Sequence, residues 1–194
     1  MPPPPHPHPL RPRLVRRAPP PRPTEIRKLI VLRGQAYDDA LDPAIVEMAS
    51  TLARPFAPDD YLAIAREIFR WVRDGIRYQR DPGLREEFAS AGEVLKRGWD
   101  DCDGKVKLAV AMLRSVGMTA DVHPVWRGGN LTHVQLRVRW PGSTKVPGNV
   151  NGWIIGDETI KGAELTQNPR AVASNPDTGK LPLSGGPSKR SPLD

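Results

Sequence analysis

The chain has 194 residues and a formal net charge of +7, and its composition excludes several classes of protein. It contains no run of 18 apolar residues that would span a bilayer, and its first residues lack the apolar segment of a secretory signal. Its single cysteine excludes an intramolecular disulfide. We therefore expect a protein that stays in the cytoplasm or is packaged in a particle.

The positive charge lies at the two ends of the chain. Residues 1–28 contain seven basic residues, one acidic residue and 11 of the 23 prolines, whereas residues 29–160 contain 17 basic and 18 acidic residues. Because proline at this density disfavours helix and sheet, residues 1–24 are predicted to be a disordered Pro/Arg-rich tail that contacts a protein partner or an acidic surface. Residues 166–194 are expected to be extended or disordered, and residues 25–165 to form one domain.

Four segments precede the cysteine. Residues 25–33 are interpreted as a short strand or an approach segment, and residues 43–53 as a first helix. Residues 59–74 have the pattern of a second helix, with a proline and aspartates at its start. Residues 90–97 are interpreted as a turn or short helix that leads to the cysteine.

Cys102 lies between Asp101 and Asp103 at the start of an apolar helical segment. The free N–H groups and partial positive charge of a helix N-terminus lower the pKa of a cysteine, which makes Cys102 a candidate nucleophile. The flanking carboxylates oppose this effect by repulsion, so a basic partner becomes more necessary. Apolar residues at steps of four, three and four predict a buried helix with an apolar stripe along one face, which ends at Gly117.

Two later strands carry the candidate partners. A glycine turn joins a strand that begins near residue 120 to a second, alternating strand that runs to residue 140, and His133 opens the second one on its polar side. A further strand ends on Asp157. A nucleophilic thiol needs an imidazole to take its proton and a carboxylate to orient that imidazole, so the order Cys102, His133, Asp157 predicts a catalytic triad. His123 is a weaker base candidate and is interpreted as structural.

The sequence predicts neither a metal ion nor an organic cofactor. A calcium loop with Asp101 and Asp103 at its third and fifth positions would have Trp99 and Val110 where carboxylates are needed. A single cysteine with scattered histidines also lacks the ligand spacing of a zinc site. We therefore expect an activity that uses no cofactor.

Four segments together resemble the transglutaminase-like, or papain-like transglutaminase-core, superfamily of cysteine enzymes in its compact bacterial and phage form. These are residues 68–78 with the following Asp81-Pro82, residues 101–118 around the cysteine, the strand that opens on His133, and Asp157-Glu158-Thr159. The resemblance covers roughly residues 43–160 and leaves both tails outside. It implies an α+β fold in which the nucleophile-bearing helix packs on a small antiparallel sheet.

The same resemblance implies a role for each matching residue. Cys102 corresponds to the nucleophile, His133 to the general base and acid, and Asp157 to the group that orients His133. Members of the family often place an aromatic or amide side chain shortly before the cysteine, so Trp99 is a candidate oxyanion donor beside the backbone N–H of Cys102. Packing is the alternative role for Trp99.

The predicted activity is acyl transfer by a cysteine-dependent enzyme. The leading hypothesis is a peptidase or amidase that hydrolyses a peptide or isopeptide bond through a thioester intermediate. A protein cross-linking transglutaminase is the first alternative, because an amine can replace water in the second step. The second alternative is a non-enzymatic phage structural or assembly protein, located in the virion, that binds partners through the fold and its basic tails. The loops at residues 83–89 and 143–151, on which substrate choice depends, show no interpretable pattern.

Overall fold

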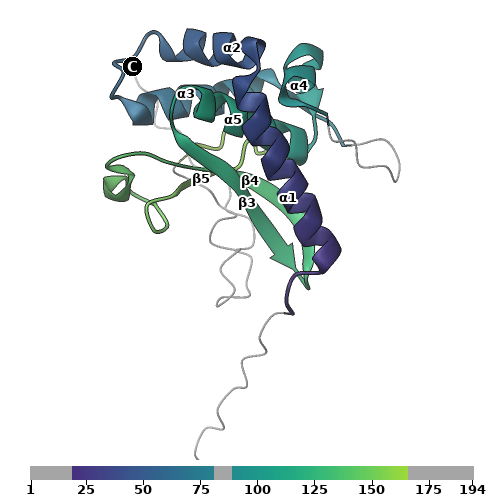
Figure 1. Cartoon of the computed structure of the whole chain (residues 1–194). Helices are drawn as coiled ribbons and strands as arrows, with labels where there is room; N and C mark the ends of the chain where they lie inside the picture. Colours follow the sequence, from purple (N-terminus) through teal and green to yellow (C-terminus); the bar gives the residue numbers. More distant parts are fainter. Residues whose placement is uncertain (1–18, 81–88, 166–194) are drawn as a thin grey trace, which may run out of the picture.

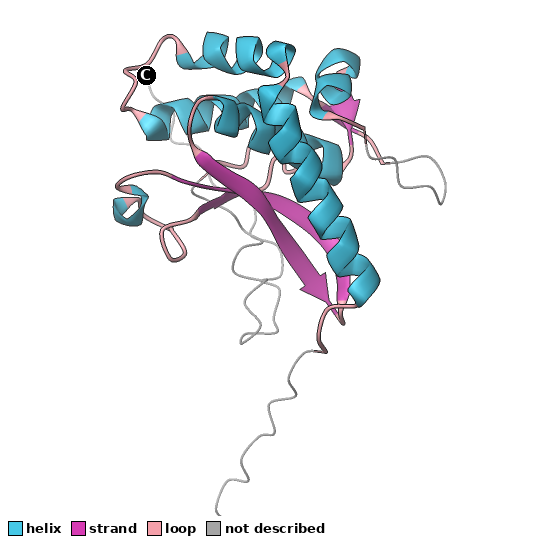
Figure 2. Ribbon diagram, in the orientation of Figure 1, coloured by secondary structure: helices cyan, strands magenta, loops and turns pink. Residues whose placement is uncertain are grey.

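The computed structural model describes residues 19–80 and 89–165. The predicted N-terminal tail up to residue 18, the C-terminal tail from residue 166 and most of the loop at residues 83–89 lie outside the described residues. Figure 1 shows helices gathered on one side of a three-stranded sheet, and Figure 2 shows the same arrangement by type of element. Within the described residues, no helix is both long and apolar enough to cross a membrane.

The chain begins with helices, alternates between short strands and helices up to residue 115, and ends with the three strands of the sheet. Their order is α1 (Pro23–Asp38), η1 (Asp39–Leu41), α2 (Pro43–Ala53), α3 (Tyr61–Gly75), β1 (Arg77–Tyr78), α4 (Ala91–Arg97), β2 (Trp99–Asp100), α5 (Cys102–Ser115), β3 (Thr119–Arg127), β4 (Asn130–Arg139), η2 (Ser143–Lys145) and β5 (Ile154–Gly156). The helix predicted at residues 43–53 is confirmed at both ends, and the helix predicted at residues 59–74 is α3.

The prediction of a strand or approach segment at residues 25–33 is wrong, because this segment belongs to α1. Pro23 stands in the first turn, where its missing N–H costs nothing, and Glu25 places a negative charge near the positive end of the helix. The residues that α1 buries recur at helical spacing and are Leu29, Leu32 and Ala36. The helix begins at Pro23, so it includes the last two residues of the predicted tail.

Local signals fix the chain on both sides of α4, which is the turn or short helix expected at residues 90–97. Ser90 and Glu93 form a capping box, in which the Ser90 hydroxyl accepts the Glu93 N–H at 3.2 Å and the Glu93 carboxylate accepts the Ser90 N–H at 2.7 Å. Gly98 then ends the helix at φ = 73°, a conformation that favours glycine. The chain continues into β2, which pairs in parallel with β1 and leads directly to α5.

The sheet is antiparallel, as the resemblance implied. β3 and β4 form a long hairpin, and β5 pairs with the other edge of β4. Val134, Leu136 and Val138 of β4 are at most 1% exposed and form the apolar face of the strand. A Cβ on Gly156 in β5 would lie 2.6 Å from the Phe69 ring of α3, so the sheet and the helices share one tightly packed core.

α5 is the central element of the fold. The sequence predicts a buried helix, and this prediction is confirmed; the burial extends beyond the predicted apolar stripe, because every residue from Gly104 to Leu113 is buried. Helices α1 to α4 and strands β3 and β4 all contact α5 (Figure 1). A helix surrounded in this way holds its first residue in a fixed place relative to both the other helices and the sheet.

Two lysines on α5 are buried together with it. Lys105 Nζ donates to the carbonyl oxygen of Ile76 at the end of α3. Lys107 Nζ donates to Gln35 Oε1 of α1 at 2.8 Å and to the carbonyl oxygen of Ala89. These bonds compensate for the removal of two ammonium groups from water and tie α5 to three other segments.

Candidate active site

Cys102 is the first residue of α5, and the surrounding sequence fixes it there. Asp101 is the N-cap, because its side chain accepts the N–H of Asp103 at 2.8 Å. The buried Asp100 carboxylate accepts the N–H of Asp101 at 2.7 Å. A Cβ on Gly104 would lie 1.8 Å from Asp100 Oδ2, so only glycine leaves room for this carboxylate beside the first turn of the helix.

His133 and Asp157 meet on the polar face of the sheet, where His133 Nε2 lies 2.8 Å from Asp157 Oδ2. Burial alone raises the pKa of Asp157, but hydrogen bonds, above all the one from His133, outweigh burial and lower this pKa to about 2. At neutral pH the Asp157 carboxylate is therefore ionised and only accepts hydrogen bonds. It follows that Nε2 of His133 carries the proton and that Nδ1 is the basic nitrogen of the ring.

Two further side chains hold the Asp157 carboxylate. Gln135 Nε2 donates to Oδ2 at 3.2 Å, so this oxygen serves both Gln135 and His133. Thr159 donates to Oδ1 through its N–H at 3.1 Å and also through its hydroxyl. Sequence reasoning missed the role of Gln135, because a polar residue on the polar side of a strand suggests exposure to solvent. The available signal was its position two residues after His133, which places both side chains on the same face.

A β-bulge in β4 brings Thr132 to the same side of the strand as His133. His133 pairs with Val125, but the next pair along the hairpin joins Trp126 to Leu131. Thr132 is therefore an extra residue at this point. Neighbours in a regular strand point to opposite faces, whereas Thr132 and His133 line the same hollows.

Two hollows meet at the candidate nucleophile and base. The smaller has a volume of about 150 Å³ and lies on the α1 side, and the larger has about 510 Å³ and lies on the β1 side. Asp101, Cys102, Thr132 and His133 line both of them. The smaller hollow is completed by Glu25, Lys28, Leu32, Asp103 and Leu131, and the larger by Tyr78, Arg80 and Thr159. The thiol and the imidazole thus lie in the middle of a cleft that extends on both sides of them.

The Cys102 thiol is held in its neutral form, which corrects the expectation of a lowered pKa at the helix N-terminus. Burial raises the pKa of Cys102 well above its ordinary value, and the charges of Asp103 and Asp101 raise it further. The thiol also lies 3.6 Å from Asp103 Oδ1, which accepts its S–H. These effects outweigh the partial positive charge of the helix end, so a base has to remove the thiol proton before Cys102 reacts.

Two other residues considered in the sequence lie elsewhere. Trp99 in β2 is not among the residues that line the two hollows, and the Arg97 guanidinium lies 4.2 Å from the centre of its ring. Its role as an oxyanion donor stays a prediction. His123 in β3 pairs with Gln135 across the hairpin, and burial lowers the pKa of His123 to about 4. His123 also lines neither hollow, which agrees with a structural role.

One group of described residues has potential metal ligands within 4.8 Å of one another, namely Asp101, Cys102 and Asp103. Their polar atoms already act on the helix end, since Asp101 caps α5 and Asp103 accepts a hydrogen bond from the Cys102 S–H. Three consecutive residues at one helix end do not surround an ion. We therefore interpret the two carboxylates as groups that cap α5 and keep the Cys102 thiol protonated.

Comparison with known proteins points to one family. The model of the transglutaminase-like superfamily matches residues 50–154. The fold is similar to that of a putative protease from Parabacteroides distasonis, with 11% identity, a TM-score of 0.47, and coverage of 72% of this chain and 29% of that one. It is also similar to a putative cysteine protease from Cytophaga hutchinsonii, with 16% identity, a TM-score of 0.42, and coverage of 71% and 46%. The chain spans less than half the length of these two proteins, and no curated protein matches it.

Proposed function

Because the chain belongs to the transglutaminase-like superfamily, we propose that it is a cysteine-dependent acyl-transfer enzyme with Cys102, His133 and Asp157 as its catalytic triad. One observation carries the proposal. Cys102 and His133 line the same two hollows, and the ring of His133 is oriented by an ionised Asp157. A nucleophile, a base and an orienting carboxylate are the parts that acyl transfer by a catalytic triad requires.

The first step is the transfer of the thiol proton to His133. Nδ1 of His133 accepts the proton from Cys102 Sγ, while the Nε2–H remains bound to Asp157 Oδ2. The positive charge on the ring is then balanced by the buried carboxylate of Asp157. Since the resting thiol is neutral, this transfer takes place as the substrate carbonyl approaches, and the thiolate does not form before the substrate binds.

The second step forms the thioester. The Cys102 sulfur bonds to the carbonyl carbon, and the electron pair of the C=O bond moves to the oxygen. The backbone N–H of Cys102, at the positive end of α5, is a donor to this oxyanion, with Trp99 as the second candidate. His133 then gives its proton to the leaving amine nitrogen, the electron pair on the oxyanion re-forms the C=O bond, and the C–N bond breaks to leave the thioester and a free amine.

The acceptor in the last step defines the enzyme class. Water, deprotonated by His133, hydrolyses the thioester and makes the protein a peptidase or amidase, which is our leading proposal. An amine in place of water makes it a cross-linking transglutaminase. Both outcomes use the same residues and regenerate the Cys102 thiol.

The pairing of thiol and base is tested by the rate at which iodoacetamide labels Cys102 between pH 6 and 9. The chain has one cysteine, so intact mass reports that residue alone. His133→Ala is expected to slow labelling at pH 7 by about tenfold or more, because the base that removes the thiol proton is lost. His123→Ala, which changes a histidine outside the cleft, serves as the matched control. Equal rates in wild type and His133→Ala would contradict the proposal.

The reaction class is tested with casein in the presence of a fluorescent primary amine. New α-amino termini indicate a peptidase, and covalent incorporation of the amine indicates a transglutaminase. Cys102→Ala is expected to abolish either product. The absence of both products, together with labelling that does not depend on His133, would instead favour the non-enzymatic assembly protein.

A further inference from the structure

α1 lies outside the residues that match the family model, yet it reaches the cleft. Residues 50–154 match that model, whereas α1 spans Pro23–Asp38 and places Glu25 and Lys28 in the same hollow as Cys102. We infer that α1 forms one wall of the substrate-binding cleft and that Glu25 and Lys28 select the charge of the substrate group that lies against this wall. This inference rests on the function proposed above.

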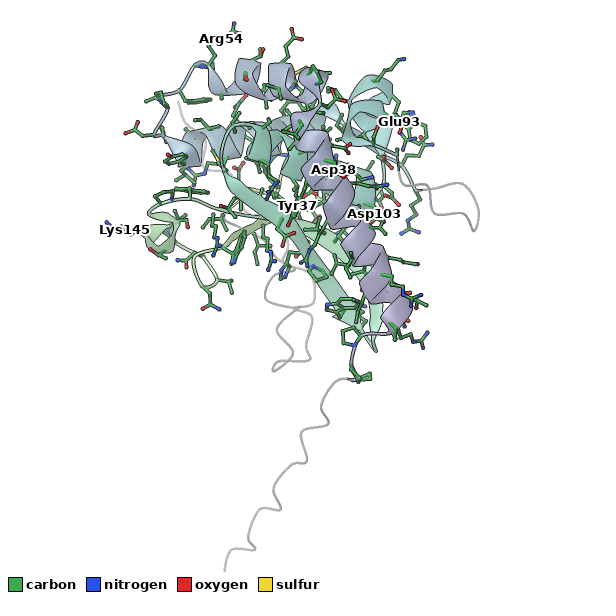
Figure 3. All side chains as sticks on the ribbon, viewed as in Figure 1. Tyr37, Asp38, Arg54, Glu93, Asp103 and Lys145 are labelled. Carbon is green, nitrogen blue, oxygen red and sulfur yellow. The ribbon has the colours of Figure 1, made fainter. Side chains whose placement is uncertain are left out.

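One side of α1 serves both the core and the cleft. Glu25, Lys28 and Leu32 follow one another at steps of three and four, so they lie on one side of the helix. Leu32 is 1% exposed and packs into the core, while the two charged side chains continue this side beyond the core. Asp103 of α5 lines the hollow opposite them, and Figure 3 shows it beside α1.

The wall is anchored at its beginning. The N–H of Arg22, directly before α1, donates to the carbonyl oxygen of Gly129 in the β3–β4 turn at 2.9 Å. Gly129 has φ = 79°, and a Cβ there would lie 2.6 Å from the carbonyl oxygen of Pro20. The turn of the hairpin that carries His133 is therefore built to let the start of α1 cross it closely.

The wall is also anchored further along the helix. Arg33 Nε lies 2.9 Å from Asp121 Oδ1 of β3, and Tyr37 donates to the same carboxylate oxygen at 2.8 Å. Gln35 accepts from Lys107 of α5 at 2.8 Å. Contacts to the hairpin and to α5 therefore hold α1 beside both halves of the candidate site in the folded protein.

The charges that line the smaller hollow favour a cationic group. Asp101 and Asp103 carry negative charge there, and α1 adds Glu25 and Lys28, whose side chains lie 3.8 Å apart and are 16% and 37% exposed. The acidic residues outnumber the single lysine on this side. The larger hollow adds a basic residue, Arg80, and no acidic residue of its own. A substrate is therefore expected to place a cationic side chain on the α1 side of the scissile carbonyl.

Charged thiol reagents test this inference without any substrate. The probes are the trimethylammonium-ethyl and sulfonato-ethyl methanethiosulfonates. With each, the Cys102 sulfur forms a mixed disulfide and displaces methanesulfinate. The measured quantity is the ratio of the cationic to the anionic rate, divided by the same ratio for 2-mercaptoethanol. We expect this selectivity to exceed one in wild type, to fall about threefold in Glu25→Gln and to rise about threefold in Lys28→Gln.

Matched variants separate a local effect from net charge. Glu47→Gln on α2 removes one negative charge, as Glu25→Gln does, and Arg27→Gln on the outer side of α1 removes one positive charge, as Lys28→Gln does. Both positions are exposed and lie away from the hollow, so these variants are expected to leave the selectivity unchanged. Equal shifts in Glu25→Gln and Glu47→Gln, a wild-type selectivity below one, or a thiol that neither reagent reaches in the folded protein would overturn the inference. The measurement does not require turnover, so a protein that selects charge but lacks activity would refute only the proposed function.

Discussion

The two halves of the candidate site differ in how their polar groups are satisfied. On the sheet, Asp157 accepts hydrogen bonds from His133, Gln135 and Thr159, and these bonds keep its carboxylate ionised. On the helix, burial and the neighbouring carboxylates raise the pKa of the Cys102 thiol and keep it protonated. The carboxylate that orients His133 is thus ionised before a substrate arrives, whereas the Cys102 thiol still carries its proton. Under the proposed function, activation of Cys102 therefore depends on His133 more than on the helix end, and five substitutions test this difference between the two halves.

Asp157→Asn is expected to have the largest effect, because it removes the ionised carboxylate that orients His133. An amide at this position can donate to Nε2 and leave the proton on Nδ1, where it blocks the uptake of the thiol proton. Turnover on the substrate found with casein should fall by roughly a thousandfold or more. Glu158→Gln changes the neighbouring carboxyl group and should retain most of the activity. Similar losses in both variants would refute the special role of Asp157.

Glu158→Gln is expected to change the pH dependence of folding. Burial, followed by the nearby charge of Asp157, raises the pKa of Glu158 to about 8. Between the ordinary pKa of Glu158 and pH 8, the unfolded chain loses a proton that the folded protein keeps, so stability falls as pH rises. The free energy of unfolding of wild type should fall, relative to Glu158→Gln, by about 1.4 kcal/mol per pH unit between pH 5 and 8. Urea unfolding at several pH values measures this slope, and parallel curves would contradict the prediction.

Gly104→Ala is expected to damage the helix half through packing. The new Cβ would lie 1.8 Å from Asp100 Oδ2 and 2.6 Å from its Cβ, so the backbone of one segment has to shift. We expect a loss of about 2 to 3 kcal/mol in unfolding free energy, as is typical of overpacking. Gly34→Ala in α1 is the matched control, because nothing lies within 4 Å of its Cβ position. That change should stabilise the protein by about 0.5 to 1 kcal/mol, and equal effects at the two glycines would disprove the account.

Thr159→Val is expected to weaken the hydrogen bonding of the Asp157 carboxylate without removing the carboxylate. The change keeps the shape of the side chain and removes the hydroxyl that donates to Asp157 Oδ1. Turnover should fall about tenfold, and the acidic limb of the pH–rate profile should move to higher pH as the support of the ionised carboxylate weakens. Thr159→Ser keeps the hydroxyl and should restore both properties. A Ser variant as poor as the Val variant would indicate a packing role instead.

Asp103→Asn is expected to reduce the difference between the two halves, because it removes a charge that keeps the Cys102 thiol protonated. Removing this charge lowers the pKa of Cys102, so a larger fraction is thiolate at any pH below that pKa. Iodoacetamide labelling at pH 8 should become about threefold faster. Asp38→Asn on the exposed side of α1 is the control for net charge (Figure 3). Slower labelling in Asp103→Asn than in wild type would show that Asp103 assists the thiol.

The elements with strong local signals were predictable from the sequence. The Pro43 start of α2 and the capping box at Ser90 are short-range patterns that the structure contains, and the alternating sequence of residues 131–140 predicted the strand β4. The order of Cys102 before a strand that opens on His133 likewise gave the family, since these motifs are local. Such features depend on a few neighbouring residues, which a single sequence contains in full.

Features that depend on tertiary contacts were not predictable. The branched residues Ile26, Ile30 and Val31 favour a strand, and α1 forms because its other side packs against α5 and the hairpin. Lys105 and Lys107 suggest an exposed helix side, yet carbonyl oxygens distant in sequence bind both in the interior. The bulge at Thr132 likewise depends on the register between two strands.

The burial of α5 on every side also determines how the site responds to thermal fluctuation. Amides in the second half of this helix can exchange with deuterium only if α1 to α4 or the sheet separate from it, so they should exchange at the rate of global unfolding. Amides in the first turn of α1, where most residues are exposed, should exchange far sooner. If α1 forms the proposed wall, heating would alter this wall before it moves Cys102, and the charge selectivity of thiol labelling would be lost at a lower temperature than the reactivity of the thiol.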